Sequence, residues 1–481
     1  MRKKLKLSVA LTGLLILCMA CKKNTITPET NTDPIITTPN NPPKDTTTTI
    51  PSIPTNKTII NVGTGSGNLI IDAQSLNIPG NAIVKIKGGS YNDIKISNFI
   101  YEKNNVVTIE NDGIVELIGE KQITFTNIKN AIFSGNGTPG ITRGFVFRNK
   151  SSDAASIQLD GNIDNFTVTN VSFKDLNTYN VIQYDSKKVY DGSDASYSKN
   201  LKFLNIDCDN TGTLIRFKGS TENGTITGLI SNIELAYITF RNSPNVGSVV
   251  SIENVDSYDI HNNLVQNVNQ NNTNHNGVFY LQGNGKFYNN VIRDHQGNAV
   301  RAWSYSIGTT PKSVLIFNNI VVNSKQYGAF ELQSFERNII PGKTTFVHAQ
   351  VFNNTCGSMY PKSTFPAQIL DLYSLMGGTC DIFNNVGYNF QLVGQNNTNF
   401  IWNELSDTKP SSFNNKYFKT YQEAGIADEN SFKLNANSVL KGAGIPLSSK
   451  VLNISNLSEI VSLDIYGSRR STSAPSIGAA E

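Results

Sequence analysis

Short apolar runs joined by paired asparagines recur through the second half of the chain. They appear in DIHNNLV, KFYNNVI, LIFNNIV, QVFNNTC and DIFNNVG, with the pairs at Asn262-Asn263, Asn289-Asn290, Asn318-Asn319, Asn353-Asn354 and Asn384-Asn385. Successive pairs are about 27 to 35 residues apart, a range in which a fixed period indicates stacked repeats that bury their hydrophobic faces against one another. The period therefore predicts a solenoid.

The residues around each pair indicate which kind of solenoid it is. The runs are β-branched or aromatic and lack the three-and-four spacing of a helix, so they are predicted to be strands. Asparagine tolerates the left-handed backbone of a tight bend, and its side-chain amide can bond the same amide one coil above. The stretch VFYLQGNGKFYNNVIRDHQGNAVRAW reads as strand, bend, strand, loop and strand. These features predict a parallel β-helix with an asparagine ladder.

The same pattern continues upstream in weaker form, for example in NLKFLNIDCDNTGTLIRF and IVKIKGGSYNDIKISN. We therefore expect one β-helix over residues 57–400, followed by a closing segment over residues 401–481 that caps it. An array of β-sandwiches would be the alternative, but it does not explain the regular spacing of the bends.

The amino terminus predicts export. Residues 1–20 combine a basic start with an apolar run over Leu7 to Leu17, which is shorter than the roughly 20 residues needed to span a membrane. Ala20 and Cys21 resemble the cleavage site of a bacterial lipoprotein signal, although Cys18 stands where Leu or Val is usual. The resemblance implies a lipid anchor at Cys21 on the outer membrane, on its periplasmic or its cell-surface side. Residues 21–56 are rich in Thr, Pro and Asn and are expected to form an extended tether.

Net charge and cysteine content change this picture little. The excess of four positive charges equals the four basic residues of the signal peptide, so the mature chain carries 37 charges of each sign. Such a balance gives no support for nucleic-acid binding, and the tethered chain is expected to be a monomer. Cys208, Cys356 and Cys380 remain, an odd number with no zinc-binding spacing, and neither the cysteines nor the scattered histidines predict a metal site.

The carboxyl end resembles a known superfamily. SFKLNANSVLKGAGIPL and DIYGSRRSTSAPSIGAAE are similar to the closing segment of secreted right-handed β-helix proteins of the pectin lyase-like superfamily. The superfamily contains polysaccharide lyases, glycoside hydrolases, carbohydrate esterases and non-catalytic adhesins, so the resemblance does not name a reaction. The matching residues are Phe432, Leu434, Ser438, Gly442, Gly444, Asp464, Gly467, Arg470, Ile477, Gly478 and Ala479.

Two columns of outward residues follow when coils are aligned on their inward apolar positions. The inward positions are Ile215/Phe217, Val250/Ile252, Phe279/Leu281, Val300/Ala302, Phe330/Leu332 and Leu370/Leu372. Because side chains alternate between the two faces of a strand, the intervening residues face outward, on strands about 4.8 Å apart. The first column is Arg216, Ser251, Tyr280, Arg301, Glu331 and Asp371, and the second is Lys218, Glu253, Gln282, Trp303, Gln333 and Tyr373.

In the enzymes that this chain resembles, the sugar lies along this sheet. Their lyases remove the proton beside a uronate carboxylate with a base, while calcium or arginine neutralises the carboxylate. The resemblance implies Arg301 as the neutralising group, Tyr280 as the acid, and Glu331 and Asp371 as calcium ligands or orienting groups. Trp303 and Tyr373 would stack on sugars, and the polar members Arg216, Lys218, Gln282 and Gln333 would bind the chain. His275 and His295 precede the strands of Tyr280 and Arg301 and are expected to join the site.

Three functions stay open at this point. Glu331 and Asp371 could instead be the carboxylate pair of a glycoside hydrolase, whose separation is about 5 to 9.5 Å. Arg301 beside Glu331 is also a favourable cross-strand ion pair, which a non-catalytic glycan-binding rod would carry equally well. The long segments SYSIGTTPKS, SFERNIIPGKTTF and GSMYPKSTFP fall beside the Arg301 to Asp371 part of the two columns, where the walls of an active site would stand. They favour a carbohydrate-active protein.

Overall fold

The computed structural model describes residues 57–359, 367–373, 375–390, 399–404, 409–449 and 457–481. The predicted signal peptide, the lipid site at Cys21 and the tether lie outside the described residues, as do residues 360–366 of the third long segment. Within the described ranges, no helix is long and apolar enough to cross a membrane.

Nearly all of the regular structure is β-strand. The first strands are β1 (Ile59–Val62), β2 (Ser66–Asp72), β3 (Ile83–Ile100), β4 (Val107–Ile118), β5 (Gln122–Ser134), β6 (Phe145–Lys150), β7 (Ile157–Thr169), β8 (Val171–Tyr184), β9 (Ser198–Leu204) and β10 (Asp207–Phe217). They are followed by β11 (Ile230–Ala236), β12 (Thr239–Ser243), β13 (Val250–His261), β14 (Leu264–Val268), β15 (Gly277–Tyr288), β16 (Val291–His295), β17 (Asn298–Ser304), β18 (Ser306–Ile307), β19 (Lys312–Phe317) and β20 (Ile320–Ser324). The last are β21 (Phe330–Gln333), β22 (Thr344–Thr345), β23 (Val347–Phe352), β24 (Thr355–Met359), β25 (Leu370–Tyr373), β26 (Thr379–Phe383), β27 (Val386–Phe390), β28 (Trp402–Glu404), β29 (Ser411–Phe413) and β30 (Lys416–Phe418), and the short helix α1 covers Leu457–Val461.

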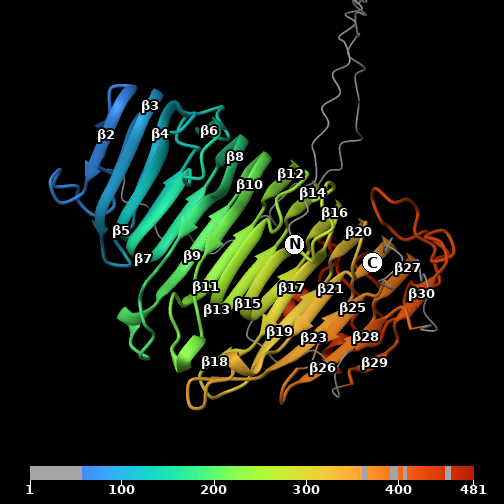
Figure 1. The fold of residues 1–481 in the computed structure, drawn as a ribbon. Coiled ribbons are helices and arrows are strands. Elements are labelled where there is room, and N and C mark those ends of the chain that lie inside the picture. Colours follow the sequence, from blue (N-terminus) through green and yellow to red (C-terminus); the bar gives the residue numbers. More distant parts are fainter. Residues whose placement is uncertain (1–56, 360–366, 374, 391–398, 405–408, 450–456) are drawn as a thin grey trace, which may run out of the picture. The chain divides into compact units, whose positions relative to one another are not determined.

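These strands wind as a right-handed parallel β-helix, as predicted (Figure 1). Sheet A contains β8, β10, β13, β15, β17, β21, β25 and β28. Sheet B contains β9, β11, β13, β15, β19, β23, β26 and β29. Sheet C contains β10, β12, β14, β16, β20, β24, β27 and β30. The parallel pairing therefore continues past residue 400, where we expected the closing segment to begin.

The two asparagines of each pair have separate roles. The first adopts a left-handed backbone, with φ between 52° and 56° at Asn262, Asn289, Asn318, Asn353 and Asn384. The second turns inward, and its amide donates to the same amide one coil on, at 2.8 to 3.1 Å along the row Asn263, Asn290, Asn319, Asn354, Asn385 and Asn415. The sequence argument assigned the bend and the ladder to one residue, whereas the structure divides them between neighbours.

The interior is apolar along its length. All of the predicted inward residues of sheet A are buried, from Ile215 and Phe217 to Leu370 and Leu372, and they belong to one continuous core. Cys208, Cys356 and Cys380 are buried there as free thiols. Burial of the inward column fixes the register, because a shift by one residue would turn every apolar side chain outward.

The carboxyl-terminal segment packs along the outside of the β-helix. The resembling residues Phe432 and Ala479 contact Ile320 and Val322 of sheet C, several coils before the end. Gly478 is required there, since its φ is 98° and an added Cβ would lie 2.8 Å from Thr355 Oγ1. The predicted capping segment is therefore a lateral cover of the sheets.

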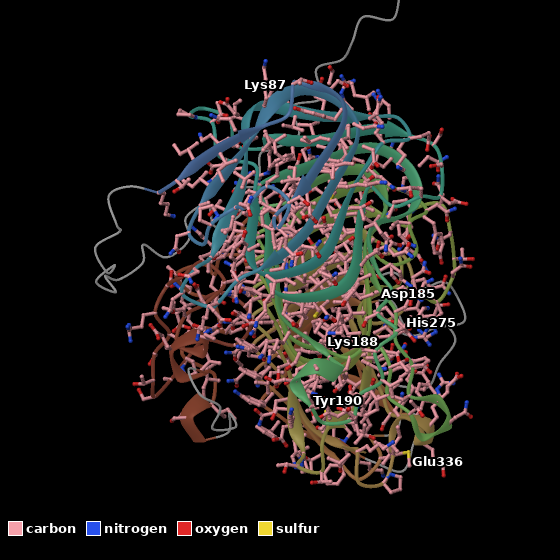
Figure 2. The ribbon with its side chains drawn as sticks, turned by 90° about the vertical axis from the view of Figure 1, so that its left-hand side faces the viewer. Lys87, Asp185, Lys188, Tyr190, His275 and Glu336 are labelled. Carbon is pink, nitrogen blue, oxygen red and sulfur yellow. The ribbon has the colours of Figure 1, made fainter. Side chains whose placement is uncertain are left out.

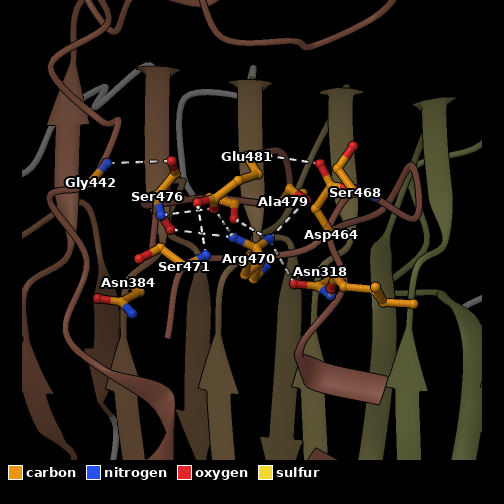
Figure 3. Close-up of polar contacts among 12 residues, drawn as sticks. Asn318, Asn384, Gly442, Asp464, Ser468, Arg470, Ser471, Ser476, Ala479 and Glu481 are labelled. Carbon is orange, nitrogen blue, oxygen red and sulfur yellow. Dashed lines mark hydrogen bonds and ion pairs between the residues drawn. The ribbon is translucent and has the colours of Figure 1, made fainter. Parts of the chain in front are cut away.

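Arg470 fastens this segment in place. Its buried guanidinium donates to the backbone oxygens of Gly478 and Ala479 at 2.9 Å and to Asn318 Oδ1 at 3.0 Å (Figure 3). Glu481 Oε2 lies 3.4 Å from the same group. The motif that carried the family resemblance is thus a structural clamp.

Candidate functional site

The outward columns lie on sheet A where the sequence placed them. The residues of the first column stand directly opposite one another on successive strands, in the order Arg216, Ser251, Tyr280, Arg301, Glu331 and Asp371. In the second column the same holds for Gln282, Trp303, Gln333 and Tyr373. Lys218 and Glu253 lie just beyond the paired parts of β10 and β13.

Glu331 is the centre of the candidate site. Its side chain has no exposed surface, yet it belongs to an outward column, because neighbouring side chains cover it. Arg301 Nε donates to Glu331 Oε1 at 2.8 Å, and the Gln333 amide donates to the same oxygen. Arg301 and Gln333 therefore both contact one oxygen of this buried carboxyl group.

His275 approaches the other oxygen of Glu331. Its Nε2 lies 2.6 Å from Glu331 Oε2 and 3.1 Å from Asn298 Oδ1. Glu331 Oε2 makes no aligned hydrogen bond, so His275 and Glu331 meet in a close polar contact. Two oxygen atoms face Nε2, an arrangement that suits the Nε2–H tautomer, in which the lone pair of Nδ1 would be available to accept a proton.

The loop before β21 covers the imidazole. The Tyr327 ring stacks on the His275 ring with centroids 4.1 Å apart and planes 9° apart. Arg301 Nη1 in turn donates to the backbone oxygen of His275 at 3.0 Å. His275, Arg301 and Glu331 therefore form one connected group from two strands and a loop.

Asp371 lies on the far side of Glu331 and is almost completely buried. Burial, and next the charge of Glu331, raise the pKa of Asp371 to about 7, although the Gly328 N–H and the Asn298 amide donate to it. The glycine permits this approach, because a Cβ at residue 328 would lie 2.8 Å from Asp371 Oδ2. Among the described residues, no ion pair to Asp371 corresponds to that of Arg301 with Glu331, so burial is not offset by a cation there.

This geometry corrects two of the expected roles. Glu331 cannot act on a sugar as one carboxylate of a hydrolase, because its oxygens are enclosed by Arg301, Gln333 and His275. The two acids also do not form a calcium site with each other, because Arg301 and His275 stand against Glu331. Throughout the described ranges, no group of three or more His, Cys, Asp or Glu side chains is arranged to hold a metal.

Aromatic residues form one wall of the site. Burial raises the pKa of Tyr280 to about 12, so its phenol remains a proton donor. The ring centroids of Trp303 and Tyr280 are 5.4 Å apart. In the loop after β21, Arg337 Cζ lies 4.4 Å from the centroid of the Trp303 ring, and the centroid of the Phe335 ring lies 4.6 Å from it. The expected sugar platform of Trp303 is thus partly covered by its own loop. Tyr373, whose pKa burial also raises to about 12, is half-buried beside Asp371.

The remaining predicted residues are not gathered at this point. Arg216 pairs with Glu253 at 2.8 Å, and Lys218 lies 3.9 Å from Asp185, three strands before Arg301. These residues line a separate hollow of about 370 Å³. Gln282 donates to the Tyr280 hydroxyl at 3.2 Å.

His295 does not join the site, contrary to our expectation. It is fully buried at the end of β16, on sheet C, and burial lowers its pKa to about 4. His275, in contrast, is partly exposed, and in Figure 2 it lies toward the same edge of the coils as Asp185. Of the two predicted histidines, only His275 can meet a ligand.

A hollow of about 690 Å³ also lies on sheet B, away from these columns. Its lysines are all close to carboxylates, with Lys202 2.6 Å from Glu234 and Lys286 3.0 Å from Asp259. The charges are thus matched within the surface itself, and we place the candidate site on sheet A.

Comparison with known proteins gives similarity of structure alone. No protein-family model matches the chain, and no curated protein has a similar sequence. Solved structures with similar folds include a PL6 family polysaccharide lyase from Pseudopedobacter saltans, with 13% identity, a TM-score of 0.41, and coverage of 77% of this chain and 96% of that one. Pectate lyase Pel9A has 12% identity and a TM-score of 0.33 over 86% of this chain and 96% of its own. At these identities and TM-scores, the similarity assigns no activity to this chain.

Proposed function

We propose that the chain is a carbohydrate-active protein that cleaves a uronate-containing polysaccharide by β-elimination on sheet A. The observation that carries this proposal is the buried carboxylate of Glu331, which holds two partly exposed basic side chains, Arg301 and His275, side by side on the outward face. A group that binds a carboxylate and a group that accepts a proton are the two that such a reaction requires.

The residues would act as follows. Arg301 would bind the uronate carboxylate with N–H groups not used on Glu331 or the His275 backbone, which makes the proton at C5 more acidic. His275 Nδ1 would accept that proton while the C4–O bond breaks and a C4–C5 double bond forms. Tyr280 would give its proton to the departing oxygen, since its phenol stays protonated. Glu331 would fix the tautomer and stabilise the imidazolium.

The test is to incubate the full mature chain with polygalacturonate and with alginate, and with amylose as the neutral control. Ultraviolet absorbance of the unsaturated product and reducing ends are followed together, with and without a chelator. We expect both signals to rise on a uronate polymer, and a chelator to leave the rate unchanged. Reducing ends alone would indicate a hydrolase, and silence together with retention on an immobilised glycan would indicate a binding rod.

Variants locate the reaction on the surface. Arg301→Ala and Glu331→Gln are each expected to lower kcat/KM by about 100-fold or more without unfolding the chain. Lys95→Ala is the matched control. The parallel register connects Lys95 of β3, through β5, β7 and β8, to Arg216 of the first column, and the Lys95 side chain is 61% exposed well before the site. Wild-type rates in both Arg301→Ala and Glu331→Gln would show that the reaction does not take place at this site.

The location of the protein stays a prediction. We propose that a lipid at Cys21 and the Thr/Pro/Asn-rich tether hold the β-helix at the outer membrane, where polymeric substrates are met. Labelling with a radioactive fatty acid in a bacterial host, lost in Cys21→Ser, checks this proposal.

A further inference from the structure

Tyr327 has a backbone conformation that few tyrosines adopt. Its φ is 75°, in the left-handed region, and most of the non-glycine residues with positive φ in the described ranges are asparagines at bends. A bulky side chain is strained in this region, and such strain persists where the surrounding structure imposes it.

The turn that carries Tyr327 is held from both sides by the preceding coil. The Gly297 N–H donates to Gln326 O at 3.3 Å, and the Asn298 amide donates to Gly328 O at 3.0 Å. Asn298 also faces His275 through its Oδ1. The segment that imposes the strained turn is therefore the one that contacts the imidazole.

The strained backbone directs the aromatic ring onto His275. The two rings stack at 4.1 Å with nearly parallel planes, and Tyr327 is almost completely buried. With one face covered by Tyr327 and its Nε2 set against Glu331 and Asn298, the imidazole has little freedom to rotate.

We propose that Tyr327 is a positioning residue, which holds His275 in the tautomer and orientation that a proton acceptor on sheet A requires. The inference rests on the proposed role of His275. Neither Tyr327 nor Asn298 was identified from the sequence, because Tyr327 lies in a loop and Asn298 is the first residue of β17, outside the two outward columns.

The test compares Tyr327→Phe with Tyr327→Asn in the full mature chain. Phenylalanine keeps the stacked ring, whereas asparagine suits the left-handed backbone and removes the ring. On the uronate polymer that the wild type cleaves, we expect Tyr327→Phe to stay within about threefold of wild type and Tyr327→Asn to lose about 10-fold or more in kcat with little change in KM.

Tyr237→Asn is the matched control. Tyr237 is another tyrosine with a left-handed backbone, at φ 57°, and its ring lies 5.9 Å from His261, far from sheet A. The same substitution there is expected to leave kcat unchanged. A loss as large as that of Tyr327→Asn would mean that the effect is general, and the inference would be wrong.

A second readout does not depend on turnover. Nitrogen-15 shifts of the His275 ring should show the Nε2–H tautomer in wild type and Tyr327→Phe, and a mixture of tautomers in Tyr327→Asn. If no polymer is cleaved, the proposed function fails, and the ring shifts alone decide whether Tyr327 positions His275. An unchanged single tautomer in Tyr327→Asn would overturn the inference in either case.

Discussion

At the scale of single residues, three buried ionisable groups near sheet A and sheet C differ in their partners. Glu331 has a guanidinium and an amide donor on one oxygen. Asp371 has only neutral donors beside a negative neighbour, so burial raises its pKa. His295 is fully buried, and the Gly297 backbone and the charge of Asp294 offset the cost of burying its charged form only in part, so burial lowers its pKa. The partners, more than the depth of burial, decide which group can serve in chemistry.

Asp371 makes stability depend on pH. A carboxyl group whose pKa is raised from 3.8 to about 7 stabilises the folded state while it is protonated, so its contribution is complete below about pH 4 and is lost as pH rises through 7. Asp371→Asn removes this dependence. The free energy of unfolding of the variant, relative to wild type, should rise by about 1.4 kcal/mol per pH unit between pH 4 and 7. Urea denaturation at several pH values measures it, and a constant difference would contradict the assigned pKa.

The sequence predicted the strand residues of the site and missed those of the loops. Arg301 and Glu331 were found because alternation in a strand and stacking of coils fix both their face and their neighbours. The burial of Glu331 could not be predicted, because it depends on His275 and Gln333 closing over it. One signal for Tyr327 was present in the sequence. Tyr327 lies four residues before Glu331 of the first column, and His275 lies five residues before Tyr280 of the same column, so loops of adjacent coils would place the two rings together.

At the scale of the structural elements, the asparagine pair is the repeating unit of the bend. The first residue provides the left-handed backbone, and the second satisfies buried backbone groups as well as its ladder partners. Asn319, for example, donates to Phe287 O at 3.0 Å and accepts from the Asn290 N–H at 3.0 Å. Each coil is thereby joined to the ones before and after it by side-chain as well as strand hydrogen bonds.

The ladder predicts a difference between its middle and its end. Asn319→Ala would leave buried partners unsatisfied on both sides, so we expect a loss of about 3 kcal/mol or more in unfolding free energy. Asn415→Ala, at the half-buried end, should cost about 1 kcal/mol. Thermal or urea denaturation measures both. Equal losses would mean that the ladder hydrogen bonds contribute little.

At the scale of the β-helix as a whole, the carboxyl-terminal segment covers an apolar surface that would otherwise be exposed to solvent. Tyr288, Phe317, Phe352, Phe383 and Phe413 stack outward along sheet B at 4.8 to 5.3 Å. Leu447 and Val461 of the terminal segment pack against this row. The period of the bends was enough to predict the β-helix, but it could not predict the path of this segment, because the segment has no repeat.

Arg470 is expected to hold this cover in place. Arg470→Ala removes the buried guanidinium that joins Asn318 to the last residues, and breaking such a network costs about 3 to 5 kcal/mol. We expect faster proteolysis within the terminal segment and increased binding of a hydrophobic dye to the uncovered row. Arg469→Ala is the control, because Arg469 is the exposed neighbour. Resistance to protease equal to wild type in Arg470→Ala would show that the clamp is dispensable.

The central claim is that Glu331 acts through the basic side chains that it holds. A double-mutant cycle of Glu331→Gln and His275→Gln, measured as kcat/KM on the cleaved uronate polymer, tests it most directly. If Glu331 acts by orienting His275, the double variant should be about as slow as the slower single variant. If the two losses multiply in full, the residues act independently, and the account of the site is wrong.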